Sequence, residues 1–205
     1  MKKILFIDDD RIILETTSDF LKSEGYEIVK AHNGEEGIEL AKNALPDLIL
    51  CDIFMPKVDG YEVFTKLQST PATCQIPFIF LTAKDGKEDI RFGMQLGVDD
   101  YITKPIDYNE LIASIQARLD KFDKTIRISE LRYRTLFEMA NDAILLVKPS
   151  TGEIMDANVT CAEMLGYNKE ELIHLFIKDI IEPNGSQSLV PLFDKTENWP
   201  EIPCT

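Results

Sequence analysis

Short apolar runs alternate with helix-like stretches over residues 1–122. The apolar runs cover residues 4–7, 26–31, 47–52, 77–83 and 100–103. Helix-like stretches follow them at residues 11–23, 35–43, 60–67, 87–96 and 108–119. Strands that alternate with helices in this way indicate parallel βαβ units. Residues 48–51 (LILC) are apolar throughout, as expected of a central strand covered on both faces. We therefore predict an α/β fold with a five-stranded, doubly wound parallel sheet.

Polar side chains gather where the predicted strands end. They are Asp8, Asp9 and Asp10 after the first strand, Asp52 at the third, Thr82 at the fourth and Lys104 after the fifth. Any one of these alone is compatible with an ordinary helix cap or a solvated side chain. Because the carboxyl ends of parallel strands meet at one edge, where such sheets bind their ligands, the joint arrangement predicts a functional site.

These residue types suit phosphoryl transfer onto a carboxylate. Three aspartates held together repel one another and raise one another's pKa, and a hard divalent cation such as Mg²⁺ (or Mn²⁺) relieves the repulsion. One carboxylate then acts as a nucleophile toward phosphorus and forms an aspartyl phosphate. Lys104 balances the charge and the Thr82 hydroxyl holds a phosphate oxygen, which is most of what this reaction needs.

Four separated motifs at this edge resemble a known family. FIDDDR, LILCDIFMPKVDGYEV, IFLTAK and DDYITKP stand in the order and spacing of the response-regulator receiver domain of two-component signalling. The resemblance covers residues 2–122 and implies a flavodoxin-like fold. It also implies that Asp52 is the phosphoacceptor. Mg²⁺ would be held by Asp8, Asp9, Asp52 and the Phe54 carbonyl. Thr82 and Lys104 would bind the phosphoryl oxygens, and Tyr101 would be a switch residue. Lys104-Pro105 matches the family's cis peptide.

The same resemblance implies a histidine kinase or phosphotransfer protein as phosphoryl donor. The chain would then catalyse only its own phosphorylation and dephosphorylation, although the parent protein could be a hybrid kinase or another signalling enzyme. Two alternatives stay open. A haloacid-dehalogenase-like phosphatase uses DxDxT after its first strand, but here Ile12 stands where threonine is needed. The other alternative is a PAS ligand sensor with an accessory receiver.

A helical pattern continues beyond Leu119 as far as Asn141. Apolar or small residues follow a 4-3-4-3 spacing, at Ile115, Leu119, Phe122, Ile126, Ser129, Tyr133, Leu136 and Ala140. This spacing is typical of a two-stranded coiled coil and predicts a homodimer through the linker helix. A helix that packs on its own domain would show a similar stripe, so both interpretations stay open.

Residues 131–183 resemble the first part of a PAS domain. AILLV and EIMDAN predict a hairpin around residues 149–152, with Asn158 in the family's DAN-type position, and short helices follow at 160–165 and 169–173. No PAS ligand is specified. Because residues 184–205 hold three prolines and no alternating strand pattern, we expect a partial α+β PAS region. The predicted domains are 1–122 (receiver), 123–140 (linker helix) and 141–205 (partial PAS).

Composition limits the partners. The net charge is −14, with 22 basic residues against 36 acidic ones, which opposes nucleic-acid binding because that rests on Lys and Arg. The apolar run at residues 4–7 is too short for a signal-peptide core or a membrane span. We therefore expect a cytoplasmic protein without membrane partners.

Overall fold

The computed structural model describes residues 1–83 and 98–181. The helix predicted at 87–96 and the proline-containing stretch 184–205 lie outside these residues. The chain forms two compact units that divide between Lys124 and Thr125. The predicted domain limits stay predictions.

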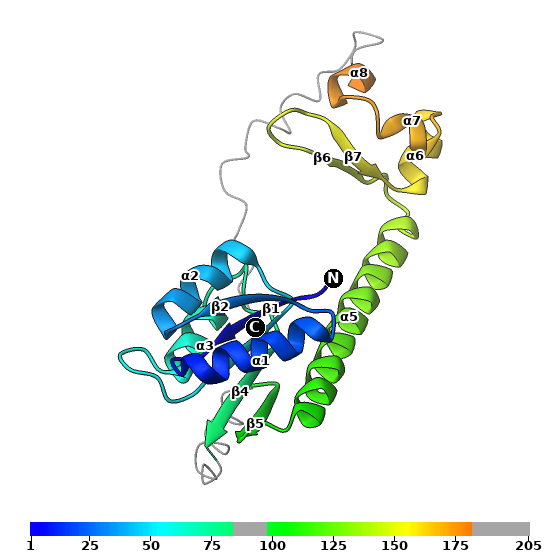
Figure 1. Cartoon of the computed structure of the whole chain (residues 1–205). Helices are drawn as coiled ribbons and strands as arrows, with labels where there is room; N and C mark the ends of the chain where they lie inside the picture. Colours follow the sequence, from blue (N-terminus) through cyan, green and yellow to red (C-terminus); the bar gives the residue numbers. More distant parts are fainter. Residues whose placement is uncertain (84–97, 182–205) are drawn as a thin grey trace. The chain divides into compact units, whose positions relative to one another are not determined.

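The first unit is built on one parallel sheet (Figure 1). Its strands are β1 (Lys3–Ile7), β2 (Glu27–Ala31), β3 (Leu48–Asp52), β4 (Phe78–Ala83) and β5 (Asp100–Lys104). The strand order is β2-β1-β3-β4-β5 and every pairing is parallel. The order reverses direction between β1 and β3, so a crevice opens beyond the carboxyl ends of these two strands.

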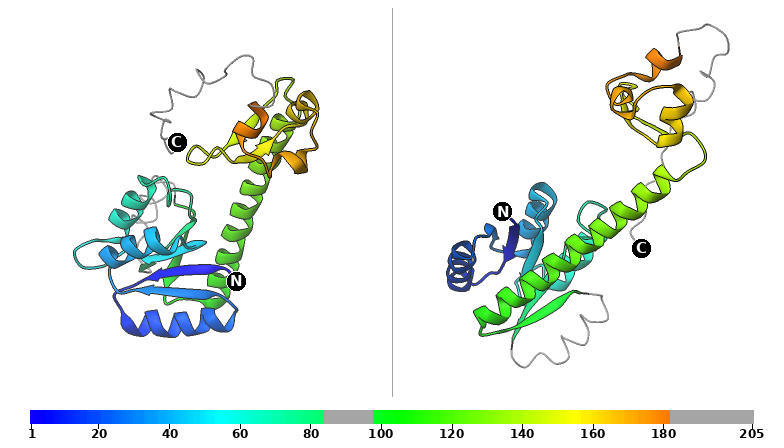
Figure 2. Two further views of the ribbon diagram at one scale, coloured as in Figure 1. Left: turned by 90° about the horizontal axis from the view of Figure 1, so that it is seen from above. Right: turned by 90° about the vertical axis from the view of Figure 1, so that its right-hand side faces the viewer.

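Helices cover both faces of this sheet. They are α1 (Arg11–Ser23), α2 (Gly34–Ala44), α3 (Gly60–Gln68) and α5 (Tyr108–Glu138). Figure 2 shows α1 and α2 on opposite sides of the strands. Strand residues alternate between two cores: Leu5 and Ile7 pack with α2 and α3, whereas Ile4 and Phe6 pack with α1 and α5. Burial on both faces explains the continuous apolar strands and confirms the predicted doubly wound, flavodoxin-like sheet.

Side-chain caps begin the three helices that follow β1, β2 and β3. Asp10 accepts a hydrogen bond from the Ile12 amide at 2.8 Å at the start of α1. Asn33 and Asp59 accept bonds from amides in the first turns of α2 and α3, at 2.9 and 2.8 Å. These caps satisfy amides that have no partner inside the helix, and they fix the loops at the functional edge.

Gly60 allows α3 to begin against the end of β3. Its amide donates to the Ile53 carbonyl at 2.9 Å. A Cβ atom at this position would lie 2.5 Å from the Asp52 carbonyl oxygen, which is too close for any side chain. The glycine therefore holds the loop after Asp52 close to the strand.

We predict that Gly60→Ala lowers the free energy of unfolding by about 1–3 kcal/mol, because the new methyl group displaces backbone and not a flexible side chain. Urea denaturation of the full chain measures this. Lys66→Ala, on the exposed side of the same helix, is the control and should change stability by less than about 0.5 kcal/mol. Equal stabilities for Gly60→Ala and the wild type would contradict the close approach.

Helix α5 runs unbroken for 31 residues. Its first turns pack on the sheet: Ile115 and Leu119, the first two members of the predicted coiled-coil stripe, lie in the core of the first unit. For these two residues, packing on the helix's own domain is therefore the correct interpretation. Beyond Lys124 the large apolar side chains of the helix are mostly exposed, including Ile128, Leu131 and Leu136.

The second unit contains the predicted hairpin and both predicted short helices. Strands β6 (Leu145–Val147) and β7 (Ile154–Ala157) pair antiparallel, and α6 (Val159–Leu165), α7 (Lys169–Leu172) and α8 (Ile177–Ile181) follow. Helix α8 was not predicted from the sequence. Ala157, Cys161, Ala162 and Leu172 form a small apolar core. No helix in the parts of the chain described here is long and apolar enough to span a membrane.

Asn158 connects three segments of this unit through hydrogen bonds. Its side chain is fully buried, and its Oδ1 accepts bonds from the Ile144 amide at 2.8 Å and the Cys161 amide at 3.0 Å. Its Nδ2 donates to the Asp142 carbonyl at 2.9 Å. One side chain thus joins the segment after α5, the start of β6 and the beginning of α6, which gives a physical reason for asparagine here.

Candidate functional site

Three carboxylates meet at the carboxyl end of the sheet. Asp8, Asp9 and Asp52 each place one oxygen so that these atoms lie within 4.8 Å of one another. Ile7 pairs with Cys51 in the sheet, so the residues that follow them, Asp8 and Asp52, emerge side by side. Asp8 and Asp52 are buried and Asp9 is exposed. The three aspartates predicted as metal ligands are therefore together.

Lys104 joins the two buried carboxylates. Its Nζ lies 2.8 Å from Asp8 Oδ2 and 3.0 Å from Asp52 Oδ1. Lys104 ends β5 and its bond to Pro105 is cis, as predicted. Three carboxylates face one ammonium group here, so the four side chains carry a formal net charge of −2.

Burial shifts the acidity of both buried aspartates. Removal from water raises the pKa of Asp52 to about 6, and Asp8 adds to this while the Lys104 ammonium opposes it. Burial also raises the pKa of Asp8, although the hydrogen bond from Lys104 acts to lower it. The site therefore holds more negative charge than its own cation compensates. Clustered carboxylate oxygens are the ligands that Mg²⁺ prefers, so this donor set fits a divalent cation.

Thr82 and Tyr101 lie on the neighbouring strands. Thr82 is fully buried in β4, one residue beyond Leu81, which pairs with Asp52. The Tyr101 ring lies 5.8 Å from the Phe80 ring, and its buried hydroxyl has no hydrogen-bond partner among the described residues. Tyr101 thus faces inward. The Phe54 side chain is 58% exposed, and the proposed metal contact of its carbonyl stays a prediction.

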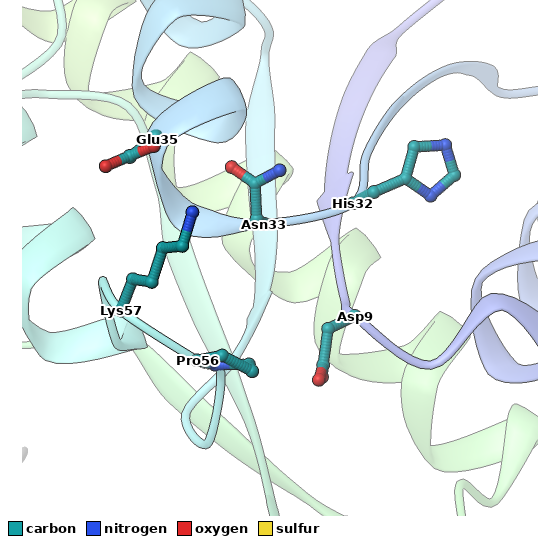
Figure 3. Close-up of a pocket in the computed structure, with 6 residues that line it drawn as sticks. All are labelled: Asp9, His32, Asn33, Glu35, Pro56 and Lys57. Atoms are coloured by element: carbon teal, nitrogen blue, oxygen red, sulfur yellow. The ribbon is translucent and has the colours of Figure 1, made fainter.

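A pocket beside Asp9 was not predicted from the sequence. It has a volume of about 150 Å³ and is lined by Asp9, His32, Asn33, Glu35, Pro56 and Lys57 (Figure 3). The rule that strand ends carry functional residues could have found Asn33, because it follows β2 at the same edge. Lys57 gives no such signal, although its φ of 70° is rare for a residue other than glycine.

Comparison with known families identifies the first unit. The model of the response regulator receiver domain matches residues 4–116. The chain belongs to the response regulator receiver family. A PAS domain model matches residues 131–199, so the predicted order of receiver and PAS region is confirmed.

Curated relatives and solved structures agree with this assignment. The receiver region is 40% identical over 124 residues to the DNA-binding dual master transcriptional regulator RpaA of Synechocystis, covering 60% of this chain and 52% of that protein. It is 40% identical over 119 residues to the transcriptional regulatory protein CpxR of Escherichia coli, covering 58% and 50%. This chain thus spans about half the length of these relatives.

Among solved structures, a CheY-like receiver domain protein from Methanospirillum hungatei is 33% identical with a TM-score of 0.57, over 61% of this chain and 98% of that one. The signal receiver domain of a histidine kinase from Syntrophus aciditrophicus is 30% identical with a TM-score of 0.55, over 59% and 92%. Membership in this family supports phosphorylation-dependent signalling by the receiver, and receivers generally bind Mg²⁺ at their acidic site.

The raised pKa of Asp52 predicts that its charge destabilises the receiver without metal. The carboxyl group of Asp52 has a pKa of about 6 in the folded state and an ordinary pKa of 3.8 in the unfolded chain. Between these two pH values the folded state therefore carries more of the Asp52 proton than the unfolded chain does. The destabilisation is therefore complete above about pH 6 and disappears as the pH falls toward 4. Asp52→Asn should raise the free energy of unfolding at neutral pH by about 2 kcal/mol.

Urea denaturation in chelator at several pH values measures this gain. In the variant the Lys104 ammonium keeps its ion pair with Asp8, so it is not left buried without a partner. Glu39→Gln, which removes one exposed carboxylate from α2, is the control. A stability gain from Asp52→Asn that does not shrink below about pH 5 would contradict the assigned cause.

Proposed function

We propose that Asp52 accepts a phosphoryl group from the phosphohistidine of a histidine kinase or phosphotransfer protein. The observation that carries this proposal is the buried bridge from Lys104 to Asp8 and Asp52 beside the exposed Asp9. In the reaction an Asp52 oxygen attacks phosphorus, the phosphorus–nitrogen bond breaks, and its electron pair stays on the imidazole.

Asp52 is a better candidate for the nucleophile than Asp8. Asp8 is fully buried, and its two oxygens accept bonds from Lys104 and from the Asp10 amide. Asp52 is 6% exposed, and only its Oδ1 has a partner among the described residues. Its Oδ2 is thus available to attack a phosphoryl group.

The other residues have supporting roles in this proposal. Asp8, Asp9, Asp52 and the Phe54 carbonyl would hold Mg²⁺, which neutralises negative charge when it is bound. Lys104 and the Thr82 hydroxyl bind phosphoryl oxygens. Thr82 is buried in β4, and in this proposal its hydroxyl moves toward the phosphoryl group, with the inward-facing Tyr101 as the switch residue.

A continuous set of contacts supports a relay from β5 into α5. Asp100, the neighbour of Tyr101, accepts bonds from Ser114 Oγ at 2.5 Å and Arg118 Nη2 at 3.0 Å, both on α5. These bonds, together with the Tyr101 amide, hold the pKa of Asp100 below its usual value despite partial burial. A displacement of β5 therefore acts on the first half of α5.

The end of α5 is bonded to residues of α6 and α7, and through Lys169 to β7. Glu138 Oε1 binds Lys169 Nζ at 2.5 Å, and Glu138 Oε2 accepts the Val159 amide at 3.0 Å. Lys169 also lies 2.9 Å from Asp156 Oδ1 on β7. Because α5 is unbroken between Asp100's partners and Glu138, we propose that it carries the phosphorylation state to the PAS region.

The proposal covers the whole sequence as a signalling module with receiver, linker helix and PAS region at 1–122, 123–140 and 141–205. It works in the cytoplasm with protein partners. DNA binding, which RpaA's name states for that protein, is not proposed for this chain, because its net charge of −14 opposes contact with phosphates. Its catalysis is limited to its own phosphorylation and dephosphorylation, and no PAS ligand is proposed.

Incubation with acetyl phosphate and Mg²⁺ tests the central claim. We predict one covalent phosphoryl group by mass spectrometry in the wild type and none in Asp52→Asn. Glu39→Gln is the control and should react as the wild type does. A phosphoryl adduct that persists in Asp52→Asn but disappears in Asp8→Asn would instead support the phosphatase alternative.

We further propose that a second copy of the chain packs against α5. Ile128, Leu131, Arg132, Thr135 and Leu136 line a shallow groove on one side of the helix. Leu131 is 57% and Leu136 is 74% exposed. These five residues have the spacing i, i+3, i+4, i+7, i+8 of one helix face, and Ile128, Leu131 and Leu136 make that face largely apolar. An identical helix offers the same stripe, and such a pair buries both stripes.

We predict that Leu131→Glu abolishes the dimer, whereas Ile126→Glu on another side of α5 preserves it. Ile126 is the matched control because its exposure, 48%, is close to that of Leu131. Sedimentation analysis with and without beryllofluoride measures the dimer. Loss of the dimer in Ile126→Glu alone would instead support the coiled-coil stripe predicted from the sequence, and a wild type that stays monomeric in both states would refute dimerisation.

A further inference from the structure

The starts of β1 and β3 lie at the edge of the sheet opposite to the acidic site, where Lys2 connects them to α5. Lys2 directly precedes β1, and its Nζ lies 2.8 Å from Asp123 Oδ1 on α5. The same ammonium lies 3.3 Å from Oδ1 of Asp47, which directly precedes β3. Figure 1 shows the start of β1 beside the middle of α5. One lysine therefore joins the helix to the two strands whose other ends lead to the buried carboxylates.

Asp47 gives this lysine a fixed base. Its Oδ2 accepts a bond from the Lys3 amide at 2.7 Å, and its own amide donates to the Lys3 carbonyl at 2.8 Å. The hydrogen bond from Lys2 to Asp123 raises the pKa of Lys2, so the ammonium group stays charged at neutral pH. The contact with α5 is thus a charged one and starts from a well-fixed part of the sheet.

Asp123 stands in the row of α5 that faces the receiver core. Leu111, Ile115 and Leu119 recur every four residues and are buried in that core. Residues four apart share one side of a helix, so Asp123 occupies the next place in the row. An aspartate at this place replaces an apolar contact with an ion pair. The two compact units divide directly after Lys124, just beyond this point.

The ion pair holds the helix differently from the apolar contacts. Apolar contacts are non-directional, so they let a helix tilt or slide while its surface stays buried. A charged hydrogen bond has a defined length and direction, and it fixes one point of the helix. The side chains of Lys2 and Asp123 are 37% and 52% exposed, so their ion pair contributes little to stability. Its main effect is therefore on the position of α5.

Asp123 divides the unbroken helix into a short arm and a long arm. Arg118, which binds Asp100 on β5, lies about 7.5 Å before it along the helix axis. Glu138, which binds Lys169, lies about 22 Å after it. A helix that is held at Asp123 and displaced at Arg118 would therefore move about threefold further at Glu138, in the opposite direction.

We propose that Lys2 is a positioning residue for the signal, and that its ion pair with Asp123 is the pivot about which α5 turns when Asp52 is phosphorylated. The inference rests on the proposed relay through α5. Movement of β5 displaces the helix near Arg118, while the pivot holds Asp123 beside the starts of β1 and β3. The far end of the helix, at Glu138, then makes the larger movement. Without the pivot the same displacement reaches Glu138 without amplification.

Nuclear magnetic resonance spectra of the full chain with Mg²⁺, with and without beryllofluoride as a phosphoryl mimic, test the pivot. The amide of Val159 donates to Glu138 and reports on the far end of α5, whereas the Tyr101 amide reports on β5. We expect beryllofluoride to shift both resonances in the wild type. In Lys2→Met the shift at Val159 should fall about threefold, which is the ratio of the two arms, and the shift at Tyr101 should not change.

Three further variants separate the pivot from a general effect of charge. Lys2→Arg keeps the cation and should restore the Val159 shift. Asp123→Asn should reduce this shift as Lys2→Met does, and the double variant should show no further loss, because both changes remove the same interaction. Lys3→Met is the matched control. The Lys3 side chain is 32% exposed, close to the value for Lys2, but its Nζ donates to the Ala44 carbonyl on α2.

An unchanged Val159 shift in Lys2→Met, or equal losses in Lys2→Met and Lys3→Met, would overturn the inference and leave the proposed function intact. If beryllofluoride shifts Tyr101 but not Val159 in the wild type, the proposed relay fails and the pivot fails with it. If it shifts neither resonance, the proposed function of Asp52 itself is refuted.

Discussion

The shared ammonium group of Lys104 is the interaction on which the site depends. It lies within 3.0 Å of two buried carboxylates that would otherwise repel each other in a poorly solvated place. Burial raises the pKa of Asp52, and one cation does not balance the charge of three carboxylates. This donor set fits a divalent cation, which is why we propose that the site binds Mg²⁺ and a phosphoryl group.

The parallel sheet makes this arrangement possible. Asp8 and Asp52 are far apart in the sequence, but neighbouring strands of the same direction deliver both to one edge. Lys104 arrives from β5 at the other side of β4. Gly60 then keeps the loop after Asp52 close to the strand, because no Cβ fits between α3 and the Asp52 carbonyl. The core residues below the site fix the strands by close packing, and the positions of the strands in turn fix the positions of the functional side chains.

Helix α5 has two roles along its length. Its first turns are part of the receiver core, through Ile115 and Leu119, and are bonded to β5 through Asp100. Its second half belongs to the second unit, where Glu138 in the last turn is bonded to Lys169. Between these anchors the helix exposes an apolar groove. The backbone hydrogen bonds of a continuous helix resist bending, which is the physical basis of our proposal that α5 connects phosphorylation to the PAS region.

The sequence by itself determined the succession of strands and helices and the positions of the three aspartates and Lys104, because apolar periodicity and strand-end position are local properties. The family followed from the resemblance of four motifs to the receiver domain. Helix α8 was missed, since its five residues give too short a pattern. The sequence left the stripe on α5 ambiguous, and only tertiary packing decided that Ile115 and Leu119 belong to the receiver core. The same holds for the pocket beside Asp9. Asn33 and Lys57 lie on different loops, and only the folded sheet brings them to one small cavity.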